Sequence, residues 1–203
     1  MFQKTIVTAM SAALLQLASF GAQAAPALTS FDAPAVFFGQ DHSLGYSFTA
    51  NQNLAVTSLG YYDSNRDGLA TTHFVGIYDT NQTLLGSAAV GGSSVLNGDF
   101  RYSALSSSIN LLTGQTYFIV GTTTGPADGW VYQASNIATN GITYTGSHFY
   151  ANTSSLNFPG SPASDRQYMT VNFDVAAVPE PETYAMLLAG LGMLGAVARR
   201  KKS

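Results

Sequence analysis

The central part of the chain, residues 25–178, contains no lysine and no glutamate. Both residues are strong helix formers that usually cover the solvent-facing side of helices. The same segment contains 21 aromatic residues, and aromatic side chains favour strands. This composition predicts strands joined by turns rather than helices.

The charge of this segment excludes several classes of protein. Its nine aspartates and three arginines give a net charge of −6, so it has no basic patch with which to bind nucleic acid. Its aromatic and β-branched content argues against disorder. The chain has no cysteine, which excludes disulfides, thiolate zinc sites and a thiol nucleophile. We expect one domain over residues 25–178, long enough to bury a core.

Apolar residues and turn signals in this segment predict about ten short strands. They cover residues 35–38, 44–49, 54–62, 73–78, 83–90, 100–105, 116–121, 130–133, 142–144, 148–150 and 168–175. Residues 117–120 are apolar on both faces, which is typical of a central strand. Pairs such as Asp128-Gly129 and Asn140-Gly141 indicate turns, and residues 152–166 read as a surface loop. The pattern predicts an all-β fold, an antiparallel β-sandwich of the jelly-roll type.

The first 24 residues have the parts of a secretory signal peptide. Lys4 provides the positive charge, residues 5–20 form the apolar region, and Ala22 and Ala24 form a small-x-small cleavage site. We predict that signal peptidase cuts after Ala24, so that the mature chain begins at Ala25. The alternative is an apolar segment that stays as a membrane anchor.

The last 25 residues, 179–203, combine a proline-rich stretch, an apolar run and a basic end. Residues 183–198 carry no charge and as a helix would be roughly 24 Å long. Such a helix crosses a hydrocarbon core of about 30 Å only if the bilayer thins or flanking residues snorkel. The basic end is Arg199, Arg200, Lys201 and Lys202. Because basic residues stay in the cytoplasm, we predict a single transmembrane helix that leaves the domain outside.

The order of these parts resembles the PEP-CTERM protein-sorting signal. Pro179, Glu180 and Pro181 form the tripeptide ahead of the apolar run, and the basic cluster follows it. Such tails are read by exosortases, membrane proteases of exopolysaccharide-producing Gram-negative bacteria. The resemblance implies transient anchoring in the inner membrane, removal of the tail near the tripeptide, and delivery to the cell surface or the extracellular matrix. The alternative is a plain tail anchor.

Residues 45–105 are similar to an uncharacterised β-sandwich domain often found ahead of PEP-CTERM tails. The similarity lies in the segment GYSFT at residues 45–49 and in VTSLGYYDSNRDGLATTHFVGIYD at residues 56–79. It implies the same fold and no particular activity.

The segment that begins at Asp63 has the opening spacing of a calcium-binding loop. Asp63, Asn65 and Asp67 place oxygen-bearing side chains at alternate positions, followed by a glycine that lets the backbone wrap. With the carbonyl of Leu69 they form a candidate Ca²⁺ site. Position twelve is Phe74, which lacks the usual bidentate carboxylate. The alternative is a polar turn between two strands.

No spacing in the chain indicates a catalytic site. His42, His73 and His148 lie far apart and lack metal-binding spacings. There is no G-x-S-x-G nucleophile elbow, and the scattered aspartates do not indicate the carboxylate pair of a glycosidase. We therefore predict that the protein is not an enzyme.

Two aromatic segments are suited to stacking against sugars. Trp130 and Tyr132 lie on one predicted strand, and Phe149 and Tyr150 on another, each after glycine-rich turns. Aromatic rings offer a large apolar area, with a polar handle in tyrosine and tryptophan. The alternative is that the aromatic residues form the core.

Together these observations predict an exported, exosortase-sorted β-sandwich protein of the cell surface or extracellular matrix. Its expected role is structural or adhesive, in an exopolysaccharide layer or biofilm. The expected partners are signal peptidase, exosortase, the membrane during sorting, and exopolysaccharide. The first alternative is a calcium-dependent carbohydrate-binding module, and the second is a polysaccharide-active enzyme.

Overall fold

The computed structural model describes residues 24–33, 35–178 and 188–195. Apart from a helical segment at residues 188–195, the regular elements are strands, and all their pairings are antiparallel. They are β1 (Ala25–Pro26), β2 (Leu28–Asp32), β3 (Ala35–Phe38), β4 (His42–Ala50), β5 (Leu54–Tyr62), β6 (His73–Asp79), β7 (Leu84–Val90), β8 (Val95–Asn97), β9 (Phe100–Leu111), β10 (Thr116–Thr122), β11 (Gly129–Tyr132), β12 (Ser135–Thr139), β13 (Ile142–Ala151), β14 (Ser161–Ala163) and β15 (Val171–Ala177). The prediction of an antiparallel, mostly β domain is confirmed.

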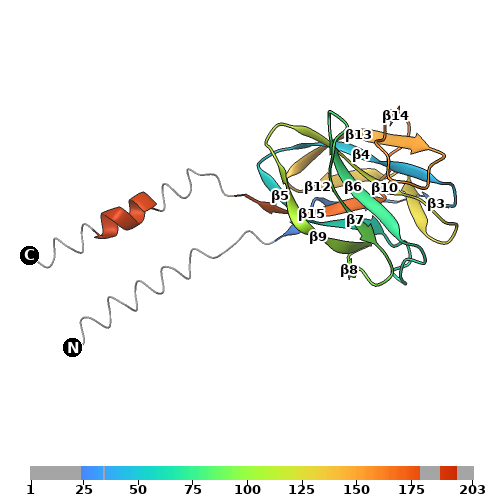
Figure 1. Ribbon diagram of the computed structural model, residues 1–203, viewed down its shortest axis with the longest axis horizontal. Coiled ribbons are helices and arrows are strands. Elements are labelled where there is room, and N and C mark those ends of the chain that lie inside the picture. The colour runs from blue at the N-terminus through green and yellow to red at the C-terminus, as the bar shows by residue number, and fades with distance from the viewer. Residues whose placement is uncertain (1–23, 34, 179–187, 196–203) are drawn as a thin grey trace, which may run out of the picture.

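Two large sheets form the body of the domain (Figure 1). One has the strand order β1-β15-β5-β9-β8 and the other β14-β13-β4-β10-β6-β7. The short pairs β11-β3 and β12-β2 are separate from them. Strand β10, which the sequence predicts as central, lies between β4 and β6.

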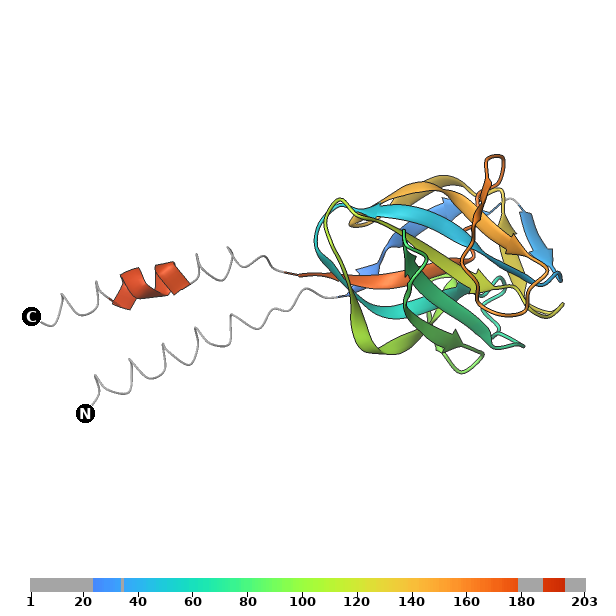
Figure 2. The same ribbon diagram turned by 45° about the horizontal axis from the view of Figure 1, so that its top comes forward.

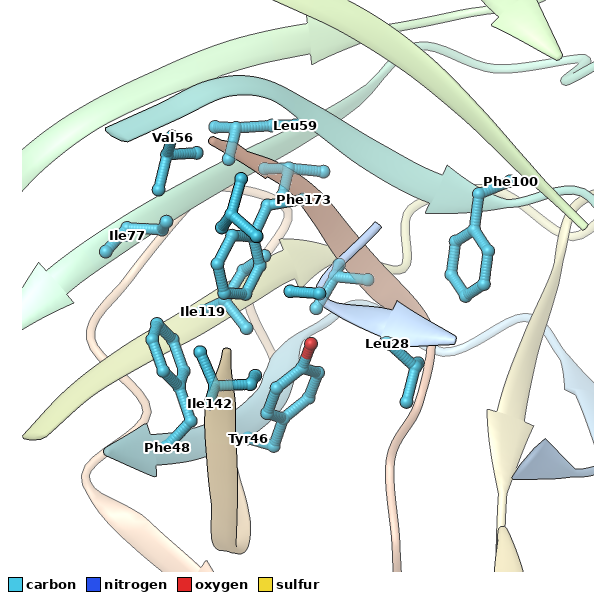
Figure 3. Packing of buried hydrophobic residues seen from close by; sticks show 14 of the residues in the cluster. Leu28, Tyr46, Phe48, Val56, Leu59, Ile77, Phe100, Ile119, Ile142 and Phe173 are labelled. Atoms are coloured by element: carbon cyan, nitrogen blue, oxygen red, sulfur yellow. The ribbon is translucent and has the colours of Figure 1, made fainter. Parts of the chain in front are cut away.

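The two sheets share one hydrophobic core. Phe48 of β4 and Phe173 of β15 come from different sheets, and their ring centroids are 4.9 Å apart. Figure 3 shows these rings together with Leu59 of β5 and Ile119 of β10. All four side chains are fully buried. Each buried side chain of this size contributes about 1.5–3 kcal/mol, so the contact between the sheets stabilises the fold.

The observed strands differ from the predicted ones mainly at β9, β13 and β15. Strand β9 runs to Leu111, six residues beyond the predicted end at residue 105. Residues 142–144 and 148–150 belong to one strand, because β13 continues its pairing with β4 through an irregularity between Tyr144 and Gly146. A bulge inserts an extra residue without ending a strand, and the glycine there is easily read as a turn. Strand β15 begins at Val171 rather than at residue 168.

Five strands were not predicted: β1, β2, β8, β12 and β14. Strands β2 and β12 pair with each other, but LTSFD and SNIAT are too polar for periodicity to separate them from loops. Strand β14 lies inside the predicted loop 152–166. Leu156 of that loop lies over β6, where a Cβ on Gly76 would be 2.7 Å from the Leu156 Cδ2.

Both ends of the domain leave it at the same pole. Strand β1 pairs with β15, with Ala25 opposite Val175, and the N–H of Val178 donates to the carbonyl of Asn53 (3.0 Å). Figures 1 and 2 show these ends at one pole and β3 at the other. We call the pole with β1 and the end of β15 the exit pole, and the pole with β3 and β11 the outer pole.

The predicted signal peptide and sorting tail fall mainly outside the described residues. Residues 1–23, the tripeptide 179–181 and the basic residues 199–202 are among those not described. Within the apolar run, residues 188–195 are helical, and Leu188, Met193 and Leu194 are exposed. No helix in the described part of the chain is long and apolar enough to cross a membrane. Cleavage after Ala24 would leave β1 whole, and it stays a prediction.

Candidate aromatic binding site

An aromatic cluster lies at the outer pole, where β3 pairs with β11. Phe37 is opposite Trp130 in the register, and its ring centroid lies 5.4 Å from that of Trp130 and 4.7 Å from that of Tyr132. The ring of Tyr168 is 6.0 Å from Trp130 and 6.4 Å from Phe149. We call Phe37, Trp130, Tyr132, Phe149 and Tyr168 the aromatic cluster.

The aromatic cluster has a buried floor and an exposed rim. Trp130 and Tyr168 are buried. Phe37 is 44% exposed, and its neighbour Phe38 is 53% exposed. Side chains alternate along a strand, so Phe37 is the exposed ring of the cluster, whereas Phe38 lies on the opposite face of β3, beside Val36 and Gly129.

Backbone and side-chain hydrogen bonds fix the floor of the cluster. The indole Nε1–H of Trp130 donates to the carbonyl of Gly39 (3.0 Å). The N–H of Val131 donates to the hydroxyl of Thr170 (3.0 Å), and the carbonyl of Thr170 accepts from the N–H of Tyr62 (2.8 Å). These bonds connect Trp130 to the backbone just before β4, and connect β11 through Thr170 to β5. The surface is therefore preformed, as in most ligand sites.

One cation lies over the edge of the cluster. The guanidinium of Arg166 is 5.3 Å from the centroid of the Tyr132 ring, a geometry that stabilises the cation on the ring face. Its Nε lies 3.8 Å from a carboxylate oxygen of Asp165. Tyr132 thus has one face covered, which leaves Phe37 as the most accessible ring of the cluster.

A hollow of about 540 Å³ adjoins the cluster; its lining residues are Gln40, Asp41, His42 and Asn152. Gln40 and Asn152 have left-handed φ values of 69° and 55°, a conformation that costs free energy in residues with a side chain. The N–H of Thr153 donates to the carbonyl of Asp41 (2.9 Å) and joins the two loops. The ring of His42 lies 6.3 Å from that of Trp130, so His42 lies between the hollow and the floor of the cluster.

A buried ion pair supports the outer pole. The Nδ1 of His73 lies 2.7 Å from the carbonyl of Thr122, and its Nε2 lies 3.0 Å from a carboxylate oxygen of Asp128. The carbonyl and the carboxylate both accept hydrogen bonds, so the two ring nitrogens are placed to donate to them when the ring carries both protons. Its plane stacks on Tyr61 with centroids 3.8 Å apart. From the sequence, His73 was considered only as a metal ligand, because no sequence pattern relates His73 to Asp128, which lies 55 positions away.

Asp128 connects two loops at this pole. Its carboxylate accepts hydrogen bonds from the N–H groups of Ala70 (2.8 Å) and Thr71 (2.7 Å) as well as from His73. Burial raises the pKa of Asp128, but the hydrogen bonds from Ala70, His73 and Thr71 outweigh burial and hold that pKa below its usual range. The pair Asp128-Gly129 was predicted as a turn, whereas Gly129 is the first residue of β11.

The predicted calcium loop is held by an ion pair. One carboxylate oxygen of Asp63 accepts from the Nε of Arg101 (2.6 Å) and from the N–H of Gly68 (3.0 Å). Asp63 is buried, whereas Asn65 and Asp67 are exposed. These contacts are the ones expected for the polar-turn alternative.

The same loop borders a pocket of about 210 Å³, and the side chain of Leu69 is buried in the core. Within the described ranges, no group of three or more His, Cys, Asp or Glu residues is arranged to hold a metal ion. Calcium binding through Asp63, Asn65, Asp67 and the Leu69 carbonyl stays a prediction.

Three of the four rings predicted to bind sugar come together. Trp130, Tyr132 and Phe149 all pack around Tyr168, whereas Tyr150 follows Phe149 and, because side chains alternate along a strand, points to the other side and is 49% exposed. The sequence missed Phe37 and Tyr168 as parts of the site. The adjacent phenylalanines before Gly39-Gln40 were the available signal. For Tyr61, Tyr62, Tyr78 and Tyr102, the core alternative is confirmed, since all four are buried.

The three histidines do not converge. His42 lines the hollow, His73 pairs with Asp128, and His148 lies on β13, with its Nε2 3.0 Å from the hydroxyl of Ser47. Burial lowers the pKa of His148. The Ser47 hydroxyl also accepts from Thr145 (2.8 Å), and Ser47 is buried, so this contact reads as packing between two strands.

Comparison with known families identifies the tail. Residues 177–202 match the family model of the PEP-CTERM protein-sorting motif, beginning at the last residue of β15. The search of curated proteins gave no match to the chain. The motif implies export and processing by an exosortase. The chain is therefore an exported protein that carries a PEP-CTERM sorting motif directly behind an antiparallel β domain.

Proposed function

We propose that the protein is a non-enzymatic adhesive component of the cell surface or extracellular matrix and that it binds exopolysaccharide through the outer pole. The observation that carries this proposal is the exposed ring of Phe37 on the aromatic cluster, near the polar hollow. Sugar rings stack on apolar faces and hydrogen-bond through their hydroxyl groups, so a site for them combines accessible rings with polar side chains.

The position of the site on the domain supports this role. The sorting motif begins where β15 ends, at the exit pole. Strand β3, which carries Phe37 of the aromatic cluster, lies at the outer pole (Figure 1). A domain held by its tail during sorting would therefore present the cluster away from the membrane, toward the surrounding polymer.

The strand order supports a jelly-roll β-sandwich as the scaffold. The orders β1-β15-β5-β9 and β4-β10-β6-β7 occur in the two sheets, and the chain passes from one sheet to the other between β4 and β5, β5 and β6, and β9 and β10. Two four-stranded sheets joined by such crossings define a jelly roll, a fold found among lectin domains. This support is an analogy of fold.

The test is affinity electrophoresis of the full-length chain in gels that contain the extracellular polysaccharide of the producing cells. Phe37→Ala/Phe38→Ala should weaken binding by roughly 30-fold, because truncating exposed anchor residues costs about 2 kcal/mol or more. Leu112→Ala is the control, since Leu112 is 59% exposed in the turn after β9, at the exit pole. Unchanged migration of the double variant would contradict the proposal.

A further inference from the structure

The charges of the domain restrict the kind of glycan that can bind at the outer pole. Residues 25–178 contain no lysine, and their three arginines are each paired with an aspartate: Arg66 with Asp99, Arg101 with Asp63, and Arg166 with Asp165. An anionic polysaccharide would therefore meet an acidic domain without an unpaired Lys or Arg among the described residues. Like charges at this density repel an approaching polyanion.

Asp41 supplies a free negative charge beside the rings. Its side chain is exposed, and within the described part of the chain its carboxylate takes part in no ion pair. Asp79, by contrast, accepts from the N–H groups of Asn81 and Thr83, and Asp67, which is also exposed, lies in the loop after β5 and does not line the hollow. Asp41 lines the hollow. It lies two residues after Gly39, whose carbonyl accepts the hydrogen bond from the indole of Trp130.

The other lining residues of the hollow are polar. The side chains of Gln40 and His42 are joined by a hydrogen bond of 3.0 Å between Oε1 and Nε2; the amide oxygen accepts, so the ring N–H donates. Gln40 and Asn152 add neutral amide groups suited to hydroxyl groups. The hollow thus combines sugar-type hydrogen bonding with the one carboxylate of Asp41.

We infer that the outer pole binds a glycan that carries ammonium groups, a partly deacetylated amino-sugar polymer. This inference rests on the proposed function. A sugar ring lies against Phe37, and an ammonium group enters the hollow and pairs with the carboxylate of Asp41. An ammonium group is also attracted to the faces of neighbouring aromatic rings. The ion pair is exposed, so it adds selectivity for charge and weakens as salt screens it.

The experiment compares three soluble probes on the full-length chain purified in detergent. They are oligosaccharides of glucosamine, oligosaccharides of N-acetylglucosamine of equal length, and a polyuronate. Binding is measured by calorimetry at a mildly acidic pH, where the glucosamine amines are charged. Asp41→Asn is the test variant, since it removes the charge and keeps the shape.

Asp79→Asn is the matched control. Asp79 lies opposite Tyr117 of β10, whereas Ser43, close to Asp41, lies opposite Thr122 at the other end of the same strand. Tyr117 and Thr122 are five residues apart on β10, so the positions of Asp79 and Asp41 are separated by about 17 Å along the strand. An asparagine also keeps the oxygen that accepts the hydrogen bonds of the turn, so Asp79→Asn changes the net charge equally without touching the hollow.

We expect the charged oligosaccharide to bind roughly fivefold more tightly than the acetylated one, an effect of the size that one exposed ion pair gives. Asp41→Asn should abolish that difference, and Asp79→Asn should preserve it. High salt should also abolish the difference in affinity, because it screens the ion pair. The inference would be overturned by equal affinities in the parent protein, by a preference for the polyuronate, or by an unchanged preference in Asp41→Asn. Binding of the acetylated probe would in each case leave the proposed function standing. No binding of any probe would count against both.

Discussion

The two poles of the domain are built by different means. At the exit pole, backbone pairing between β1 and β15 holds the chain ends, and glycines with left-handed φ occupy the turns at Gly114 and Gly141. At the outer pole, Gly39 is left-handed as well, and beside it so are Gln40 and Asn152, which have side chains; away from this pole, Gln82 in the turn between β6 and β7 is also left-handed. Glycine adopts this conformation without steric cost, and other residues do not. The outer pole therefore holds conformations that are costly by themselves.

The outer pole depends on buried side chains for its stability, whereas backbone pairing holds the exit pole. The outer pole exposes two phenylalanines and is supported by the buried pair of His73 and Asp128. Strain and exposed apolar surface persist in proteins where the surrounding structure fixes them, and they collect at functional sites. Variants that act on one pole and spare the other test whether the two poles are stabilised differently.

The largest effect is expected from His73→Ala. The substitution leaves Asp128 buried without its cation and removes the ring that stacks on Tyr61. Removing one partner of a buried ion pair costs about 3–5 kcal/mol, so the free energy of unfolding in urea should fall by about that amount. At the exit pole, Leu112→Ala should change it by less than about 0.5 kcal/mol. A loss below about 1 kcal/mol in His73→Ala would show that the pair does not support the outer pole.

A second pair of variants compares a covered ion pair with an open one. Asp63 is buried beside Arg101, whose side chain is 14% exposed, whereas the side chains of Arg66 and Asp99 are 61% and 49% exposed. Asp63→Asn should cost about 2–3 kcal/mol, because it leaves a partly buried guanidinium unpaired. Asp99→Asn should cost about 0–1 kcal/mol. Thermal unfolding of both variants measures the difference, and equal costs would contradict it.

Asp128 and Asp174 should respond to pH with opposite signs. Asp128 has a pKa below its usual range, so its stabilisation is present above the pKa of the unfolded carboxyl and is lost as pH falls through the folded pKa. Burial raises the pKa of Asp174, although the bond from Ser58 lowers it in part. For Asp174, stability is therefore full at acid pH and is lost as pH rises through the folded pKa.

Asp174→Asn tests this sign. One carboxylate oxygen of Asp174 is buried without a hydrogen-bond partner among the described residues. We expect the variant to gain up to about 1 kcal/mol at neutral pH and nothing at acid pH, where the parent carboxyl is already neutral. Asp128→Asn should instead lose stability at neutral pH and show a shallower acid limb. Unfolding curves across pH would contradict the assignment if both variants shifted in the same direction.

The smallest effect is expected from calcium. Arg101 and the N–H of Gly68 already occupy an oxygen of Asp63, so an ion would have to displace a cation from a buried carboxylate. We expect the melting temperature of the full-length chain to agree within about one degree in calcium and in chelator. A rise of a few degrees with calcium, absent in Asp67→Ala, would establish the site instead.

The strands that carry the core were predictable, and the outer pole was predictable only in part. Strand β5 was predicted with its observed bounds, and β10 in its central place, because apolar periodicity reports burial directly. Trp130 and Tyr132 were predicted from a local pattern. Periodicity carries no information about contacts between distant residues, so the approach of Phe37 to Trp130 and of His73 to Asp128 could not be predicted.

The same limit applies to the calcium hypothesis, which stays a prediction. The spacing of Asp63, Asn65 and Asp67 is local and visible in the sequence, whereas Arg101, which neutralises Asp63, lies 38 residues away on β9. A pattern of potential ligands does not reveal which of them the fold has already paired.

The chain contains one tryptophan, and it lies in the floor of the aromatic cluster. Trp130 fluorescence therefore reports on the outer pole alone. The most direct test of the account is a titration of the full-length chain with oligosaccharides released from the exopolysaccharide, read by Trp130 emission and by its quenching with acrylamide. We expect a saturable change in emission, which Phe37→Ala/Phe38→Ala abolishes and Leu112→Ala leaves intact. Binding that calorimetry detects while Trp130 emission stays constant would place the glycan elsewhere and contradict the account.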